Sequence, residues 1–288
     1  MFLSRDLDHE KAQRRRGLLG YSKRVVNLFL SLWPFTHLVK RISRYAPFRW
    51  LFKPVVNEKV FQVTFVPVSE DIPTPQDTAI PRLALAELIK ASSHRFIYNG
   101  CICRQREGCR NYPQDMGCLF LGEAASRLHP SLGHQASVEE CLEHMEKMAA
   151  LGLTGMIGRL WMDATAMGVL HDFRNFLVVC FCCDCCCLVR TDMRKVPQHL
   201  KRGIKRLEAV KVTVTDKCLG CGTCVEACFV AASSLREGRA YIDDHLCKGC
   251  GRCAMVCPQQ AIRVEFDERD AIWQELLSRV QPVVGRAP

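Results

Sequence analysis

The sequence lacks the short motifs that mark several large enzyme classes. It has no phosphate-binding loop, no HExxH metal motif and no arrangement of a nucleophile with its base. Gly152, Gly155 and Gly158 lack the G-x-G-x-x-G spacing and follow no predicted strand, so no dinucleotide site is expected there. The nine histidines are scattered, and we expect ordinary core or surface roles for them. Nothing in these features therefore predicts a hydrolase or a nucleotide-dependent enzyme.

Targeting and membrane-spanning signals are also absent. Charged residues such as Arg5 and Asp6 interrupt the start of the chain, where a secretory signal would need an apolar run. The apolar stretch 25–39 is interrupted by Pro34, and it is shorter than the roughly 20 residues that cross a bilayer. Free thiols suit a reducing compartment. We therefore expect a cytoplasmic protein, with contact at the inner membrane face as a further hypothesis.

Cysteine, in contrast, is abundant, with 19 among 288 residues, 48% of which are hydrophobic. Residues 218–228 read CLGCGTCVEAC and residues 247–258 read CKGCGRCAMVCP, and both contain C-x₂-C-x₂-C-x₃-C. Four thiolates must converge on a compact iron–sulfur core, and glycine turns such as those at Gly220 and Gly249 let the backbone wrap it closely. Zinc ribbons instead use separated C-x₂-C pairs. The two runs therefore favour iron–sulfur clusters over zinc.

The two runs resemble a bacterial-type dicluster ferredoxin over roughly residues 216–266. Phe229 departs from that pattern, because a proline usually follows the first run. The resemblance implies two 4Fe–4S clusters, each held by three cysteines of one run and the last cysteine of the other. The implied ligand sets are Cys218, Cys221, Cys224 and Cys257 for one cluster, and Cys247, Cys250, Cys253 and Cys228 for the other.

Ten further cysteines upstream are candidate metal ligands. Four of them, in the pattern C-x-C-x₅-C-x₈-C, predict a third cluster, and the first two would share one face of an extended strand. Six more occupy eight positions within CFCCDCCC, and a strand would point them to opposite faces unless the chain turns. The candidates are Cys101, Cys103, Cys109, Cys118, Cys180, Cys182, Cys183, Cys185, Cys186 and Cys187. Cys141 lies within a predicted helix, and we expect it to be a small buried apolar residue.

The segments CICR, GCLFLGEAA and CFCCDCCC are together similar to the upstream part of a group of bacterial ferredoxin-domain proteins of unknown activity. We predict an α+β protein, in which a C-terminal dicluster ferredoxin module joins a cysteine-rich, mostly helical domain. Within the latter, we expect a strand at 60–68, a capped helix from Ser137 to about Leu151 and a core helix over 156–169. The predicted domain boundaries are 1–59, 60–200, 205–266 and 267–288.

Positive charge is concentrated in the N-terminal arm. Residues 1–60 contain 13 Lys or Arg and 4 Asp or Glu, which accounts for +9 of the net +10. Basic and aromatic residues are interleaved over 23–53, a composition typical of a helix lying in lipid headgroups. The same segment would also suit packing on the protein itself or on a partner subunit. Nucleic-acid binding is the least favoured interpretation.

These features predict an electron-transfer protein that passes single electrons through two 4Fe–4S clusters and a third upstream, between redox donor and acceptor proteins. In the alternative, the chain is an oxidoreductase subunit whose upstream cysteine site acts on a substrate, and the ferredoxin module supplies it with electrons. A third hypothesis makes the clusters structural and the arm a binding segment.

Overall fold

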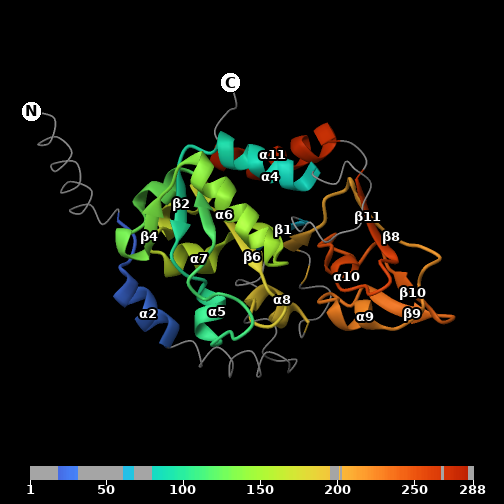
Figure 1. Ribbon diagram of the computed structural model, residues 1–288. Coiled ribbons are helices and arrows are strands. Elements are labelled where there is room, and N and C mark those ends of the chain that lie inside the picture. The colour runs from blue at the N-terminus through green and yellow to red at the C-terminus, as the bar shows by residue number, and fades with distance from the viewer. Residues whose placement is uncertain are drawn as a thin grey trace, which may run out of the picture.

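The computed structural model describes residues 19–31, 61–67, 80–194, 201, 203–266 and 269–284. The predictions for residues 1–18 and 32–59 of the arm lie outside this part of the chain. The described part is mixed α and β (Figure 1). Its longer helices are α2 (Lys23–Ser31), α4 (Ile80–Ala91), α6 (Val138–Ala150) and α11 (Arg269–Val284). The short helices are α5 (Ile102–Arg106), α7 (Trp161–Ala166), α8 (Leu188–Met193), α9 (Thr223–Ala227) and α10 (Arg252–Met255).

Seven strands form one sheet in the upstream region (residues 61–205), in the order β4-β2-β3-β6-β5-β1-β7. Neighbouring strands are antiparallel except β1 and β7, which are parallel. The strands are β1 (Phe61–Val66), β2 (Arg95–Tyr98), β3 (Leu119–Leu121), β4 (Gly133–Gln135), β5 (Thr154–Leu160), β6 (Leu177–Cys182) and β7 (Ile204–Lys205).

The sheet corrects two expectations. The predicted helix over 156–169 is wrong, because β5 occupies 154–160 and only the short α7 follows it. A strand at the centre of a sheet is buried on both faces, so it has a continuous apolar run that periodicity cannot distinguish from a buried helix. Helices are present in the upstream region, but this sheet rather than a helical bundle organises it. The strand predicted at 60–68 is confirmed as β1.

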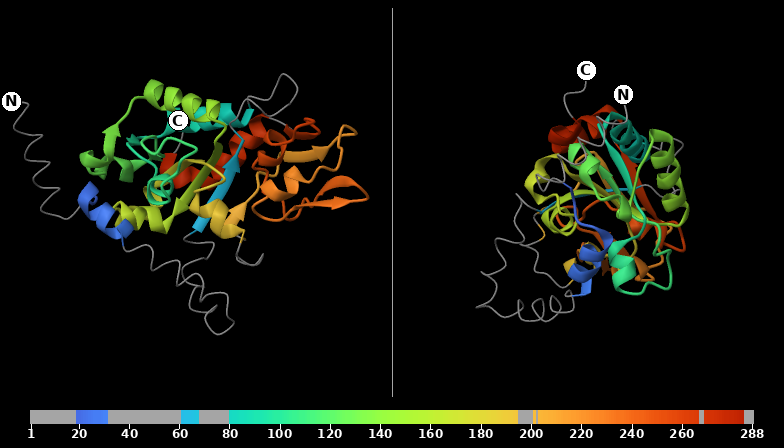
Figure 2. Two further views of the ribbon diagram at one scale, coloured as in Figure 1. Left: turned by 60° about the horizontal axis from the view of Figure 1, so that its bottom comes forward. Right: turned by 90° about the vertical axis from the view of Figure 1, so that its left-hand side faces the viewer.

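Helices α4, α6 and α11 cover one face of the sheet (Figures 1 and 2). The predicted capping box opens α6: the Ser137 hydroxyl accepts from the Glu140 amide at 3.1 Å, and the Glu140 carboxylate accepts from the Ser137 amide at 2.8 Å. Although α11 comes last, its buried residues Ile272 and Leu276 share a core with Leu85 of α4. The helix therefore ties the end of the described chain back to the upstream region.

The C-terminal region (residues 210–266) consists of two strand pairs and two short helices. Strand β8 (Val210–Val214) pairs with β11 (Ile262–Phe266), and β9 (Ser233–Arg236) pairs with β10 (Arg239–Ile242), both antiparallel. Helices α9 and α10 each begin within a cysteine run.

The N-terminal helix α2 is attached to the upstream region through the residues before it. The Gly20 amide donates to the Arg127 carbonyl at 2.8 Å, and the Tyr21 amide donates to the Met167 carbonyl at 2.9 Å. Val26 is fully buried, whereas Val25 and Leu28 are exposed. No helix within the described ranges is long and apolar enough to cross a membrane.

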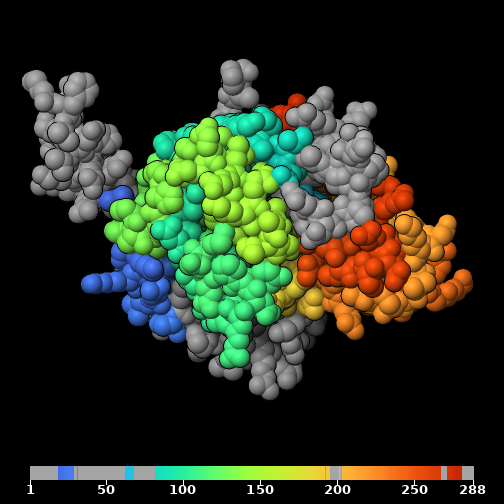
Figure 3. Space-filling view, viewed as in Figure 1, coloured from blue at the N-terminus to red at the C-terminus, as the bar shows by residue number. Residues whose placement is uncertain are grey.

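The C-terminal region lies directly against the upstream region (Figure 3). Phe229, which stands where ferredoxins usually have proline, is 1% exposed and packs on Phe65 of β1 with ring centroids 5.0 Å apart. The guanidinium of Arg190 lies 5.0 Å from the centroid of the Phe229 ring. The departure at Phe229 therefore provides a contact between the two regions.

Truncating Phe229 tests this contact. We expect Phe229→Ala to lower the free energy of unfolding by about 3–5 kcal/mol, because it removes a buried aromatic side chain and leaves a cavity. Urea unfolding of the full-length, anaerobically purified protein measures the change. Leu170→Ala, at a half-exposed apolar position outside the apolar cluster that contains Phe229, is the control and should cost much less. Equal losses in the two variants would contradict a specific role for Phe229.

Candidate metal centres

The eight cysteines of the C-terminal region line two separate cavities. Cys218, Cys221, Cys224 and Cys257 line the first, and Cys228, Cys247, Cys250 and Cys253 line the second. Each cavity thus combines three cysteines of one run with the last cysteine of the other. The structure brings together the same two sets of four that the ferredoxin resemblance implies. Each cavity could hold a cluster with one thiolate for each of four irons.

Glycines shape the turns around these cavities. Gly222 and Gly251 have left-handed backbone conformations, with φ of +81° and +75°, directly before α9 and α10. At Gly220, a Cβ atom would lie 2.0 Å from the Gly238 carbonyl oxygen, which leaves no room for a side chain. The backbone can therefore turn sharply enough for cysteines three residues apart to face one centre.

Backbone amides surround the cysteine sulfurs. The amides of Ala232 and Ala240 approach the sulfurs of Cys228 and Cys218 at 3.2 Å and 3.3 Å. Equivalent contacts reach Cys247 at 3.4 Å and Cys257 at 3.3 Å. Such bonds stabilise negative charge on sulfur, and in iron–sulfur proteins they raise the reduction potential. The C-terminal region therefore already provides the donors that a cluster requires.

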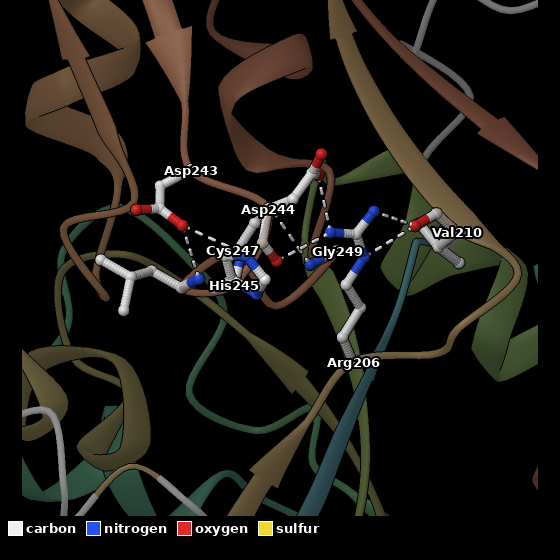
Figure 4. Close-up of polar contacts among 8 residues, drawn as sticks. Arg206, Val210, Asp243, Asp244, His245, Cys247 and Gly249 are labelled. Carbon is white, nitrogen blue, oxygen red and sulfur yellow. Dashed lines mark hydrogen bonds and ion pairs between the residues drawn. The ribbon is translucent and has the colours of Figure 1, made fainter.

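Arg206 fixes the loop that leads into the second run (Figure 4). Its guanidinium donates to the Val210 carbonyl at 2.7 Å and to the Asp244 carboxylate at 2.9 Å. Asp243 accepts from the His245 amide at 2.9 Å, which tightens the turn before Cys247. The loop is thus held from both sides, and sequence reasoning did not single out any of these polar residues.

The pKa values of three of these cysteines depart from the ordinary value. Burial raises the pKa of Cys253 well above its usual range and that of Cys247 to about 11. The pKa of Cys221 is lowered, because the Thr223 hydroxyl hydrogen bonds to its sulfur at 3.4 Å. Buried thiols without metal are therefore held in the protonated form, and metal binding must displace their protons.

Six upstream cysteines form a second kind of arrangement, which we call the six-thiol ring. The sulfurs of Cys118 and Cys180 are 3.2 Å apart, and all six cysteines line one cavity of about 60 Å³. The carboxylate of Asp163 faces the same cavity, and desolvation raises its pKa to about 7. The ring consists of Cys101, Cys103, Cys187, Cys182, Cys180 and Cys118.

Crowding of the thiols shifts their pKa values in opposite directions. Hydrogen bonds from neighbouring thiols lower the pKa of Cys101 and Cys187, whereas hydrogen bonds to those two raise the pKa of Cys103, Cys118 and Cys182. Adjacent thiolates repel, so all six sulfurs cannot ionise together without a compensating cation. Metal is the natural source of that positive charge.

The sheet register explains how the ring is assembled. Antiparallel pairing of β3 with β6 places Leu119 opposite Val179, so Cys118 lies beside Cys180. Cys101 and Cys103 are not on an extended strand as expected, because Cys101 immediately precedes α5 and Cys103 lies within it. Both nevertheless reach the ring. Cys109, predicted to share a site with these cysteines, lies elsewhere.

The remaining four upstream candidates, Cys109, Cys183, Cys185 and Cys186, form a separate group, the thiol quartet. Their sulfurs all lie within 4.8 Å of one another. The segment CFCCDCCC does turn, but it does not serve one site. Three of its cysteines belong to the ring and three to the quartet. Cys141 belongs to neither group and is fully buried in α6, where desolvation raises its pKa to about 11.

Arg104, which the sequence analysis did not identify as functional, positions the cysteine loop. It is 1% exposed, and its guanidinium donates to the carbonyls of Pro113, Met116 and Phe181. These bonds join the loop between Cys109 and Cys118 to the end of β6. No carboxylate in the described chain forms an ion pair with Arg104, so its buried charge faces thiols instead.

Asp184 connects the upstream region to the C-terminal region through two arginines. Its carboxylate pairs with the fully buried Arg190 at 2.5 Å and with Arg252 of α10. Desolvation by itself would lower the pKa of Arg190, but Cys250 and Asp184 outweigh it and raise that pKa. Arg190 thus lies near both the six-thiol ring and the second C-terminal cavity. In the sequence, the only indication of this contact is an acidic residue, Asp184, among the cysteines of CFCCDCCC.

Comparison with known proteins places this chemistry in context. The 4Fe-4S binding domain family matches residues 211–233 and 240–263. Ferredoxin 7Fe of Hydrogenibacillus schlegelii is 37% identical over 70 residues, which cover 24% of this chain and 85% of that protein. Pyruvate synthase subunit PorD of Methanothermobacter marburgensis is 40% identical over 53 residues, or 18% of this chain and 62% of the subunit.

A larger relative matches a smaller share of its length. One subunit of the ion-translocating oxidoreductase complex of Methanosarcina acetivorans is 38% identical over 55 residues, which are 19% of this chain and 21% of that relative. The chain therefore spans about a fifth of the length of this relative. No solved structure matches the chain.

The Thr223 hydroxyl should tune the potential of whatever cluster Cys221 binds. We expect Thr223→Val to lower that reduction potential by tens of millivolts, because a hydrogen bond of about 1 kcal/mol that favours the reduced, more negative cluster is lost. Anaerobic titration monitored by electron paramagnetic resonance measures the potential. Thr223→Ser keeps the hydroxyl and should show little change. Equal shifts in the two variants would assign the effect to packing.

Proposed function

The chain belongs, through residues 211–263, to the 4Fe-4S ferredoxins, and on that premise we propose that it passes single electrons between redox proteins through a short series of clusters. Two 4Fe–4S clusters occupy the C-terminal region. Their proposed ligands are the two sets of four cysteines that line the cavities described above. The grouping of the eight cysteines into these two cavities is the observation that carries the proposal.

A third iron–sulfur cluster is proposed in the six-thiol ring. Six cysteines lining one cavity exceed any need of packing, and the buried charge of Arg104, which pairs with no carboxylate of the described chain, is suited to an anionic cofactor. A buried guanidinium without a carboxylate is costly unless another negative group balances it. An iron–sulfur cluster bound by thiolates provides that negative charge. This assignment replaces Cys109 of the predicted set with cysteines from β6 and the turn after it.

The positions of the sites support transfer between them. Cys182 and Cys187 of the ring share one apolar cluster with Cys228, Cys247 and Cys250 of the second C-terminal cavity. The second C-terminal cluster would therefore lie between the ring and the first. Electrons would pass from the ring to this cluster and then to the first, or in the reverse direction. The donor and acceptor are proposed to be subunits of an oxidoreductase complex, because one relative is by name a subunit of such a complex and another is a subunit of pyruvate synthase.

A catalytic role of the ring is the second candidate. The ring has more sulfurs than the four that a cubane uses, and Asp163 faces the same cavity with a raised pKa. Such a site would bind a substrate at an open metal position, as catalytic metals do. A change in the spectrum of the third cluster on adding a substrate would identify this case.

Loss of one ring cysteine tests the third cluster. The full-length protein, purified or reconstituted without oxygen, should contain clearly more than the eight iron and eight sulfide of two 4Fe–4S clusters. Cys118→Ser should lose iron and sulfide in equal amounts and retain reversible reduction of the remaining clusters. Cys141→Ala, outside every proposed site, is the control and should keep the full content. Eight iron in the wild type would contradict the third cluster, whereas failure of reversible reduction would contradict the electron-transfer role.

The arm is proposed to contact an anionic membrane surface. On α2, Val26 packs inward, whereas Val25 and Leu28 are exposed beside the exposed cations Lys23 and Arg24. An exposed apolar face flanked by basic residues is suited to the headgroup region of a bilayer. The rest of the segment to residue 53 lies outside the described ranges. Docking to a partner protein is the competing interpretation.

Vesicle binding distinguishes the two interpretations of the arm. The full-length protein should co-sediment with anionic vesicles, and salt should weaken but not abolish binding, because burial of apolar side chains is not screened. Leu28→Glu should weaken binding about tenfold or more, since a buried leucine contributes about 1.5–3 kcal/mol. Ser31→Glu adds the same charge at an exposed polar position and controls for repulsion. If the wild type ignores both anionic and neutral vesicles, the arm is a protein-docking segment.

A further inference from the structure

The thiol quartet has a geometry different from that of the other cysteine sites. We propose that Cys109, Cys183, Cys185 and Cys186 bind a single zinc ion rather than an iron–sulfur cluster. The proposal is independent of the electron-transfer function, because zinc has no redox chemistry. It assigns the quartet a structural role.

The spacing of the sulfurs supports one ion. Cys185 lies 3.6 Å from Cys109 and 3.6 Å from Cys186, sulfur to sulfur. Four thiolates at about 2.3 Å from one tetrahedral zinc ion are about 3.8 Å from one another. All six distances in the quartet are below 4.8 Å. The four sulfurs therefore surround a space the size of one ion.

The proposed cluster sites provide an internal comparison. Thiolates on four different irons of a cubane are separated by the width of the cluster as well as by the iron–sulfur bonds, so they lie further apart than four on one ion. Among the described residues, the quartet is the only group of three or more Cys, His, Asp or Glu side chains whose ligand atoms all lie within 4.8 Å of one another. Neither C-terminal set of four cysteines meets that distance. The same chain thus contains two classes of four-cysteine site.

Three members of the quartet, Cys109, Cys183 and Cys186, are buried. Buried thiolates need a positive charge close by, which a metal ion supplies. A disulfide between Cys109 and Cys185 would account for only two of the four sulfurs. Four thiolates on one zinc satisfy every member of the quartet.

The position of the site indicates what the ion would stabilise. Three ligands belong to the turn after β6, and the fourth comes from the loop after α5, 74 residues before Cys183 along the chain. The same turn contains Asp184, which pairs with Arg190 and with Arg252 of the C-terminal region. A zinc ion here would fix the turn on which the contact between the two regions depends.

Metal analysis of the full-length protein tests the proposal. After anaerobic purification and dialysis against a chelator, the wild type should retain one zinc per chain in addition to its iron and sulfide. Cys185→Ser alters the one exposed ligand and should reduce zinc to near zero without changing iron, sulfide or the spectra of the clusters. Cys141→Ser, a cysteine outside the sites, should keep both zinc and iron.

A second measurement avoids dependence on the folding of the variant. Protein produced with cobalt in place of zinc should show the absorption bands of tetrahedral, thiolate-bound Co²⁺ in the wild type. The proposal is overturned if the wild type contains no zinc. It is also overturned if Cys185→Ser loses iron, either alone or together with sulfide. Failure of the proposed electron-transfer role would instead appear as absent or irreversible reduction, with the zinc content unchanged.

Discussion

Both upstream cysteine groups depend on the paired charges of Asp184, Arg190 and Arg252. The turn at 183–187 directs Cys182 and Cys187 toward the ring and Cys183, Cys185 and Cys186 toward the quartet. The Asp184 carboxylate forms ion pairs with Arg190 and Arg252, and these pairs hold the geometry of the turn. Breaking the pair with the buried Arg190 would leave an unpaired charge away from water, which is costly. The arrangement of sulfur in the upstream region thus depends on charge pairing at this turn as well as on the register of the sheet.

The same charges relate the upstream region to the C-terminal region. Arg190 packs on Phe229, and it lies close enough to Cys250 for the sulfur to influence its pKa. A ferredoxin that functions alone needs no large apolar residue at this place. In this chain, Phe229 and Phe65 form a contact that places the second C-terminal cavity beside the six-thiol ring. The residue that departs from the ferredoxin pattern therefore helps to join the two parts.

The ferredoxin sites could be predicted from sequence because their ligands are local, with fixed spacings and glycine turns that allow few other arrangements. The upstream sites could not, since their ligands come from segments far apart whose relation is set by the sheet. The pairing of Cys118 with Cys180 follows from the register of β3 and β6, which no local pattern encodes. Likewise, β5 has the apolar run of a buried helix, and the roles of Arg104 and Arg190 depend on burial. The capping box of α6 and strand β1 were predictable because their signals are local.

The return of α11 to the upstream region has a consequence for synthesis of the chain. The apolar face formed by Leu85 of α4 and Leu177 of β6 is completed by Leu276, which leaves the ribosome long after both. Until then, this face is open and exposed to other nascent chains or chaperones. The cysteines of the C-terminal region emerge before α11 as well. Closure of this part of the core therefore waits until residues 269–284 have been made, after all of these cysteines.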